Sequence, residues 1–135
     1  MKKIFLLAIT IIFMLVGCNN KENIKISDLE GYWVDEHIYE NELGVDKVIE
    51  FTDSEEMVVY SYYDKGIKVY ELEVEESTSD KITFSIDDGD EVIDLEKVDD
   101  EKYKYRVDDE ELYIVKIDES EAEKFIQVID ENSEY

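Results

Sequence analysis

Clusters of turn-forming residues recur along most of the chain at intervals of about 9 to 13 residues. This spacing limits the segments between them to the length of a strand. The clusters are rich in Asp, Ser, Thr and Gly, which favour turns, and no proline interrupts the segments. They lie at residues 52–54, 64–66, 77–80, 87–90, 99–101, 108–110 and 118–120. The pattern is typical of an all-β sandwich or barrel.

Within these segments, apolar and polar side chains alternate, which places them on opposite faces of a strand. Residues 82–86 show the clearest alternation, and residues 102–107 repeat it with Tyr and Val against Lys and Arg. Residues 56–63 are apolar on both faces, which favours a central position in a sheet. Gly66 can adopt the positive φ of a three-residue hairpin loop, so a strand over 67–74 is expected to follow.

These segments predict eight or nine antiparallel strands in up-and-down order. Closure of the meander into a barrel would remove exposed strand edges. The fold at residues 120–130 is ambiguous. Ala122, Phe125, Ile126 and Ile129 fit one face of a helix capped by Ser120, whereas Phe125 and Ile129 also fit a closing strand. We favour the strand, with a short C-terminal helix as the alternative.

Near the N-terminus, two lysines precede an uncharged apolar run over 4–17, as in a signal peptide. The run is shorter than the roughly 20 residues that a membrane-spanning helix needs. The sequence Leu-Val-Gly-Cys at 15–18 resembles the bacterial lipobox. The resemblance implies that a diacylglyceride is attached to the sulfur of Cys18 and that cleavage occurs between Gly17 and Cys18. An ordinary secretory signal would have an A-x-A-like site, which is absent; an uncleaved anchor is the other alternative.

This interpretation divides the chain into a signal peptide over 1–17, a lipidated cysteine with a polar tether over 18–25, and one domain over 26–135. Two acyl chains hold a protein stably at a bilayer. The expected location is therefore the extracytoplasmic side of the cell membrane, and the membrane is a partner through the lipid on Cys18. Because Cys18 is the only cysteine, an intramolecular disulfide is impossible.

The domain is strongly acidic. Removal of residues 1–17 takes away two lysines and no acid, so the formal net charge of −24 becomes −26. Such a charge repels nucleic acid, anionic lipid and anionic wall polymers, permits cationic partners, and provides a solvated coat. Leu, Ile, Val and Phe still make up about 27% of the residues after Gly17. This exceeds the roughly 20% below which disorder is expected, so we predict a folded domain without a nucleic-acid partner.

The sequence Asp-Leu-Glu-Gly-Tyr-Trp at 28–33 resembles the Gly-x-Trp motif that opens the first strand of lipocalin-like proteins. Together with the β-meander and the segments 112–114 and 125–128, it makes the chain similar to small lipocalin-like lipoproteins of low-GC bacteria. The resemblance implies a calycin-type barrel in which Gly31 opens the first strand and Trp33 closes one end. It implies no known ligand, and the basic residue that stacks over the tryptophan in lipocalins is not evident from the sequence.

Few residues suggest chemistry. Alternation from Trp33 would place Asp35 and His37 on the same face, but no nucleophile motif accompanies this pair. One histidine and a lipidated cysteine cannot supply a zinc site. Residues 87–91 offer oxygen ligands around Gly89 without the spacing of a known calcium loop, so a solvated turn is favoured over a metal site. Tyrosines in the predicted strands could form a stacking surface, although plain packing is favoured: Tyr60, Tyr62, Tyr63, Tyr70, Tyr103, Tyr105 and Tyr113.

The sequence therefore predicts a lipid-anchored, non-enzymatic binding or accessory module without a cofactor or metal, and it identifies no protein or small-molecule partner. One alternative is a small enzyme that acts on envelope material through His37 and nearby carboxylates. Another is that the cleaved signal fragment, residues 10–17, acts as a secreted signalling peptide.

Overall fold

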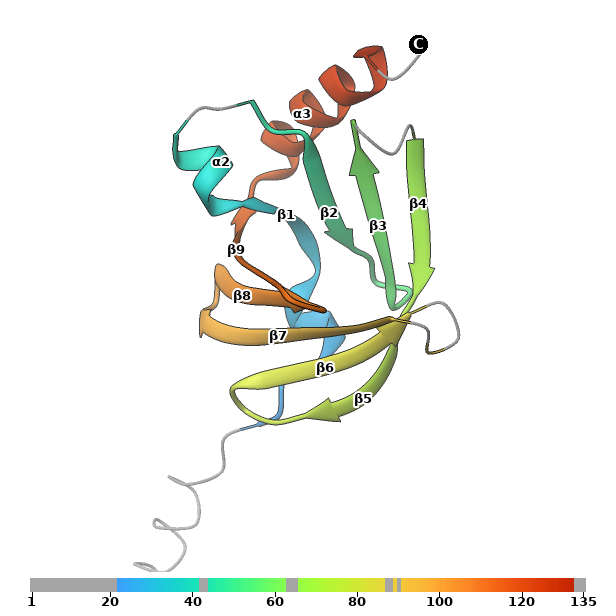
Figure 1. Ribbon diagram of the computed structural model, residues 1–135, viewed down its shortest axis with the longest axis vertical. Helices are drawn as coiled ribbons and strands as arrows, with labels where there is room; N and C mark the ends of the chain where they lie inside the picture. The colour runs from blue at the N-terminus through green and yellow to red at the C-terminus, as the bar shows by residue number, and fades with distance from the viewer. Residues whose placement is uncertain (1–21, 42–43, 63–65, 87–88, 90, 133–135) are drawn as a thin grey trace, which may run out of the picture.

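The computed structural model describes residues 22–41, 44–62, 66–86, 89 and 91–132. In this part of the chain, nine antiparallel strands form one sheet in the order β4-β3-β2-β1-β9-β8-β7-β6-β5, which curls into a nearly closed barrel (Figure 1). The strands are β1 (Gly31–Asp35), β2 (Lys47–Phe51), β3 (Glu56–Ser61), β4 (Gly66–Glu71), β5 (Glu73–Ser77), β6 (Lys81–Ile86), β7 (Glu91–Asp99), β8 (Lys102–Val107) and β9 (Glu110–Ile117). The helices are η1 (Ile26–Leu29), α2 (Glu36–Glu40) and α3 (Glu119–Asn132).

The pairing of β1 with both β2 and β9 joins the first and last strands of the meander. The two edge strands, β4 and β5, follow each other in the chain but do not pair. The single strand predicted over 67–74 is therefore wrong, because the chain bends at Leu72. The Leu72 side chain is buried in the core and its backbone N–H donates to the Glu55 carbonyl. The bend carries the chain from the β2–β4 layer to the strands that cross it, β5 to β8 (Figure 1).

Most of the predicted turns are confirmed where the structure describes them. The β2–β3 connection turns at 53–54, and the β8–β9 hairpin turns at 108–109. Gly66 has the expected positive φ, +132°. The apolar segment at 56–63 contributes β3, which lies between β2 and β4 and is therefore one strand in from the sheet edge. Tyr63 lies outside the described residues.

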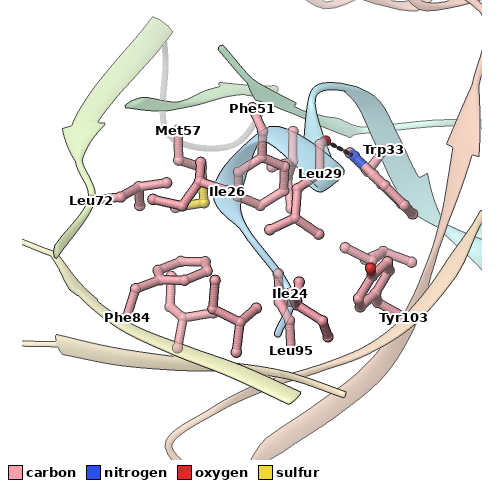
Figure 2. Close-up of a cluster of buried hydrophobic side chains, with 14 of the residues drawn as sticks. Ile24, Ile26, Leu29, Trp33, Phe51, Met57, Leu72, Phe84, Leu95 and Tyr103 are labelled. Carbon is pink, nitrogen blue, oxygen red and sulfur yellow. Dashed lines mark hydrogen bonds between the residues drawn. The ribbon is translucent and has the colours of Figure 1, made fainter. Parts of the chain in front are cut away.

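One end of the barrel is filled by apolar side chains that η1 brings across it. Leu29 and Trp33 are fully buried, and the indole Nε1–H donates to the Leu29 carbonyl at 2.8 Å. The Tyr103 ring meets the Trp33 ring edge-on, with centroids 5.4 Å apart and planes at 81° (Figure 2). Ile24 also packs into this cluster, so packed structure extends into the segment that the sequence suggested was a tether. We call this the closed end.

The C-terminal segment is the helix α3, so the favoured strand at 120–130 is wrong and its alternative is confirmed. β9 already pairs with β1 and β8, and a further strand would have no free edge there. The helix instead packs across the outer faces of β1, β2 and β3. Ala122 and Ile129 are buried against Val34 and Val48 on that face. The helix starts at Glu119, which places Ser120 inside the first turn instead of at the cap.

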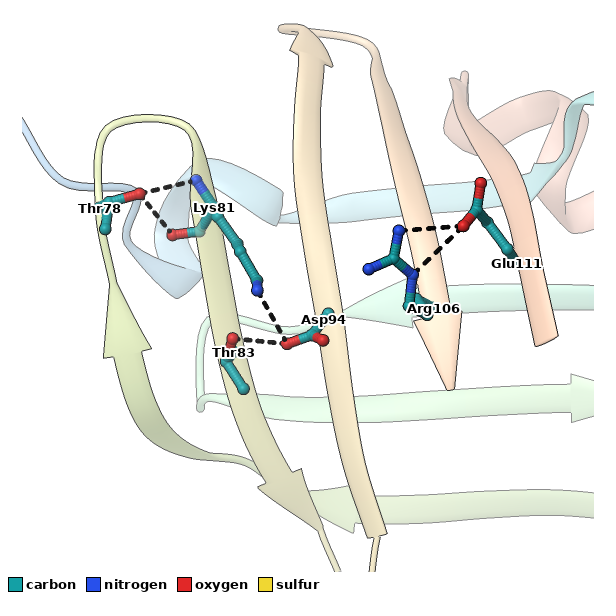
Figure 3. A network of polar contacts seen from close by, with 6 residues as sticks. All are labelled: Thr78, Lys81, Thr83, Asp94, Arg106 and Glu111. Atoms are coloured by element: carbon teal, nitrogen blue, oxygen red, sulfur yellow. Dashed lines mark hydrogen bonds and ion pairs between the residues drawn. The ribbon is translucent and has the colours of Figure 1, made fainter. Parts of the chain in front are cut away.

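The outer face of the β6–β9 strands carries cross-strand polar contacts. Thr83 donates to Asp94 across β6 and β7 at 2.6 Å, and the Lys81 ammonium lies 3.8 Å from the same carboxylate (Figure 3). Arg106 on β8 pairs with Glu111 on β9 at 3.0 Å. The cations on this face therefore neutralise neighbouring acids.

Replacing Trp33 with alanine should lower the free energy of unfolding by about 3 to 5 kcal/mol, because it leaves a cavity at the closed end and removes the bond to Leu29. That is a large share of the ~5 to 15 kcal/mol of a typical domain. His37→Ala, at an exposed position, should cost little and serves as the control. Denaturant titrations followed by circular dichroism give the comparison, and a Trp33→Ala protein as stable as wild type would contradict the assignment.

Candidate functional site

The opposite end of the barrel is hollow. A cavity of about 390 Å³ lies where β1, β3 and β8 end and where β2, β7 and β9 begin, with one residue of α2 at its rim. The deepest residues, Trp33, Ile49 and Ile114, separate it from the closed end. The cavity is lined by Trp33, Val34, Asp35, Ile38, Asp46, Lys47, Ile49, Ser61, Glu91, Tyr105, Val107, Glu110, Leu112 and Ile114. We call this end the open end.

The hollow follows from the side chains that point inward. Toward the closed end, the inward side chains include Phe51, Phe84 and Tyr103, which fill the cross-section of the barrel. Toward the open end, Val107 and Leu112 are only partly buried, and the β3 strand contributes the small Ser61. Because these smaller side chains do not meet across the barrel, a space with largely apolar walls remains.

A smaller space of about 140 Å³ adjoins the cavity between the β3–β4 strands and the β6–β8 strands. The two share Lys47, Ser61, Glu91 and Tyr105. The interior of the open end therefore extends from α2 toward the side of the barrel where β4 and β5 do not pair.

Negative charge gathers at the open end. Asp46, Glu91 and Glu110 line the cavity, and among the described residues none of their carboxylates has an ion pair or a side-chain hydrogen bond. Asp35 also lines it, but its carboxylate caps α2 by accepting the His37 backbone N–H at 2.9 Å. Lys47 is the cation in this lining. The charge of the cavity lining is therefore negative overall.

Tyr105 lines the same cavity as these carboxylates. Burial raises the pKa of Tyr105 well above its ordinary value near 10, and the negative charges of Glu91 and Glu110 raise it further. Both effects oppose the formation of an anion. The cavity therefore disfavours negative charge on any group placed beside this phenol.

The structure does not bring together the proposed catalytic pair. The strand β1 ends at Asp35, and His37 lies in α2 with its side chain exposed. The expectation that Asp35 and His37 share a strand face is therefore wrong. The carboxylate binds backbone N–H groups, while the imidazole Nδ1 lies 3.2 Å from the Asn41 amide nitrogen. The reason is local, because an Asp that precedes a helix is a favourable N-cap.

Lys116 is the basic residue near Trp33 that the sequence analysis missed. Its ammonium lies 5.8 Å from the centre of the indole ring, a cation–π distance. A Cβ added to Gly31 would lie 2.7 Å from the Lys116 side chain, so glycine leaves room for this contact. Alternation along β9 could have identified it, because Leu112, Ile114 and Lys116 are spaced two apart.

The predicted tyrosine surface is divided between the two faces of the sheet. Tyr103 and Tyr105 point inward, whereas Tyr60 points outward and donates to Glu50 at 3.0 Å. Burial and this hydrogen bond raise the pKa of Tyr60 to about 12. Tyr62 and Tyr113 are exposed. The tyrosines therefore do not form one continuous stacking face, and packing accounts for the buried ones.

Several predicted residues lie outside the described part of the chain. These are Gly17 and Cys18 of the lipobox and most of the acidic turn at 87–91. Within the described ranges, no group of three or more His, Cys, Asp or Glu side chains is arranged to hold a metal ion. Also within those ranges, no helix is both long and apolar enough to cross a bilayer.

Comparisons with protein-family models, curated proteins and solved structures find no match to this chain. The described strands nevertheless form a nearly closed antiparallel barrel that is compatible with a lipocalin-like fold.

The Tyr105 hydroxyl should titrate above pH 10, and Glu91→Gln should lower its pKa by removing one nearby negative charge. A phenol with a raised folded-state pKa stabilises the fold fully below pH 10 and loses that contribution as pH rises through the raised value. NMR of ring-labelled tyrosine, assigned with Tyr105→Phe, measures both effects. An ordinary pKa for Tyr105 would show that its ring is solvated and the cavity wet throughout.

Proposed function

We propose that this protein is a lipid-anchored, extracytoplasmic binding module that holds a small, largely apolar molecule at the open end of its barrel. The observation that carries the proposal is the hollow above Trp33, in a barrel whose interior toward the other end is occupied by a cluster of buried apolar side chains. A barrel that served only as a scaffold would gain stability from filling both ends.

The cavity has features common to small-molecule sites. Its volume of about 390 Å³ lies near the lower limit of the usual ~300 to 1,000 Å³. Its walls are provided by apolar side chains such as Ile49, Val107 and Leu112, with a few polar groups converging from Ser61 and Tyr105. Apolar walls supply affinity by burying ligand surface, and a few polar groups supply orientation.

The position of the N-terminal segment fits an anchored module. Ile24 is held at the closed end, where its N–H donates to the Thr78 carbonyl at 2.8 Å and Ser77 donates to its carbonyl. Cys18 is six residues earlier, a distance of at most about 21 Å at ~3.5 Å per residue. A lipid on Cys18 would hold the closed end near the membrane and leave the open end directed away from it.

No observation on the described residues favours the alternative of an envelope enzyme, since Asp35 is occupied as a helix cap and His37 is exposed on α2. The alternative of a signalling peptide concerns residues 10–17, outside the described part, and stays a prediction.

Filling the cavity should weaken ligand binding. Leu112→Trp places a bulky ring in the cavity wall and should weaken binding of the neutral fluorophore N-phenylnaphthylamine by at least about tenfold. The matched control is Val92→Trp, which adds the same ring at a position 48% exposed on the outer face of β7. Full-length protein carrying Cys18→Ala is used throughout, so that no acyl chain competes for the fluorophore. Equal binding by the two variants, or no binding by the parent protein, would overturn the proposed function.

Cys18→Ala should abolish acylation and maturation, because the sulfur is the atom to which the lipid is attached. Metabolic labelling with a fatty acid, followed by fractionation, measures the label and the location together. Ser27→Ala, at an exposed position in η1, is the control and should retain both. Equal label on the Cys18→Ala and wild-type proteins, or wild-type protein found entirely in the medium, would refute the anchor.

A further inference from the structure

We propose that the molecule held at the open end carries a positive charge: an amphiphile whose apolar part enters the barrel and whose cationic group stays among the carboxylates of Asp46, Glu91 and Glu110. This inference rests on the proposed function and specifies the class of ligand.

The first argument is the position of these carboxylates relative to the apolar walls. Glu91 begins β7 and Glu110 begins β9, so both lie at the open end, beyond Leu112, and Glu110 pairs directly with Val107. Asp46 precedes β2 on the opposite side of the opening. A molecule whose apolar part contacts Leu112 would therefore place its other end between acids from three elements.

The second argument is the lack of compensating charge. Two partly buried acids elsewhere have a lysine partner, Glu36 with Lys102 at 2.7 Å and Asp94 with Lys81 at 3.8 Å. Glu50 and Glu121 each accept a hydrogen bond from a tyrosine hydroxyl. Asp46 and Glu91 are also partly buried, yet the described residues offer neither of them an ion pair. A cation brought by a ligand would supply the missing partner.

The lysines near the opening do not cancel the negative charge of these carboxylates. Lys47 lines the cavity and Lys68 lines the adjoining smaller space, and neither lies within 4.0 Å of a carboxylate of Asp46, Glu91 or Glu110. With Asp35 included, four carboxylates face two ammonium groups. Lys47 is also exposed, which lets its flexible side chain move into water when another cation arrives.

The third argument is the electrostatic effect on Tyr105. Its phenol, inside the cavity, is held in the neutral form by burial and by the charges of Glu91 and Glu110. A ligand anion at the same place would meet the same opposition, whereas a cation would gain from those charges. Fatty acids and phosphate esters are therefore poor candidates, and amines with apolar substituents are good ones.

The test compares three probes with the same apolar chain: decyltrimethylammonium, decanol and decyl sulfate, each below its micelle concentration. Trp33 is the only tryptophan and lines the cavity, so a saturable change in its emission reports occupancy. The cation should bind at least about tenfold more tightly than the sulfate, with decanol between them. Higher salt should reduce the advantage of the cation.

Charge variants then locate the effect. Glu91→Gln combined with Glu110→Gln should weaken decyltrimethylammonium by about five- to tenfold and leave decanol unchanged, as expected for two partly solvated charges. Glu73→Gln combined with Glu76→Gln makes the same change in net charge on the exposed strand β5 and should have no such effect. Lys47→Gln should act in the opposite direction and tighten binding of the cation.

The outcomes separate the two proposals. If decanol binds and the cation shows no advantage, or if the remote pair of variants acts like the pair at the open end, the inference about charge is wrong and the proposed function stands. If none of the three probes changes Trp33 emission and N-phenylnaphthylamine does not bind either, the proposed function fails and the inference fails with it.

Discussion

The packing of Trp33 against Leu29 and Tyr103 is the interaction on which the rest of the barrel depends. β1 is the strand that pairs with both β2 and β9, so it joins the two halves of the meander. Trp33, at its centre, fixes that strand to η1 through the Nε1–H bond to Leu29 and to β8 through the ring of Tyr103. The indole is also the floor of the cavity. The same side chain therefore completes the packed end and sets the depth of the hollow one.

The barrel is closed by hydrogen bonds everywhere in its sheet order except between β4 and β5, where the covalent chain at Leu72 makes the connection. An open sheet edge invites pairing with another chain, and charged side chains on it oppose that. Exposed Lys68 and Glu71 lie on β4, and exposed Glu73, Glu75 and Glu76 lie on β5. The high negative charge thus protects an edge that the topology leaves unpaired, as well as keeping molecules of this acidic chain apart.

The fold class and most of the turns in the described residues could be predicted because they depend on local chemistry or on a period of two. The burial of Trp33 was expected only from the resemblance of residues 28–33 to a lipocalin-like motif. The bend at Leu72 could not, because Glu71, Leu72 and Glu73 are not turn-forming residues and only the packing of Leu72 in the core reveals it. The helix α3 was predicted as a strand because the spacing of Phe125 and Ile129 fits both a helix and a strand. The helix forms because its apolar side chains cover the apolar outer faces of β1 and β2. His37 was placed on a strand because alternation was extended past Asp35, where the N-cap ends β1.

The cavity was beyond sequence reasoning for a different reason. Whether a barrel is hollow depends on the sum of inward side-chain volumes at each level, and that sum requires the register. Ser61, Val107 and Leu112 are small or medium residues that line the same cavity from β3, β8 and β9. Glu91 and Glu110 line the same cavity from the first residues of β7 and β9. An empty space and unpaired negative charges both weaken the packing of the open end relative to the closed one. A ligand that fills the space and carries a cation would relieve both, so it would stabilise the fold by an amount that rises with ligand concentration relative to its Kd. The empty space and the unpaired charges at the open end would therefore both lower the stability of the free protein and favour binding of the ligand.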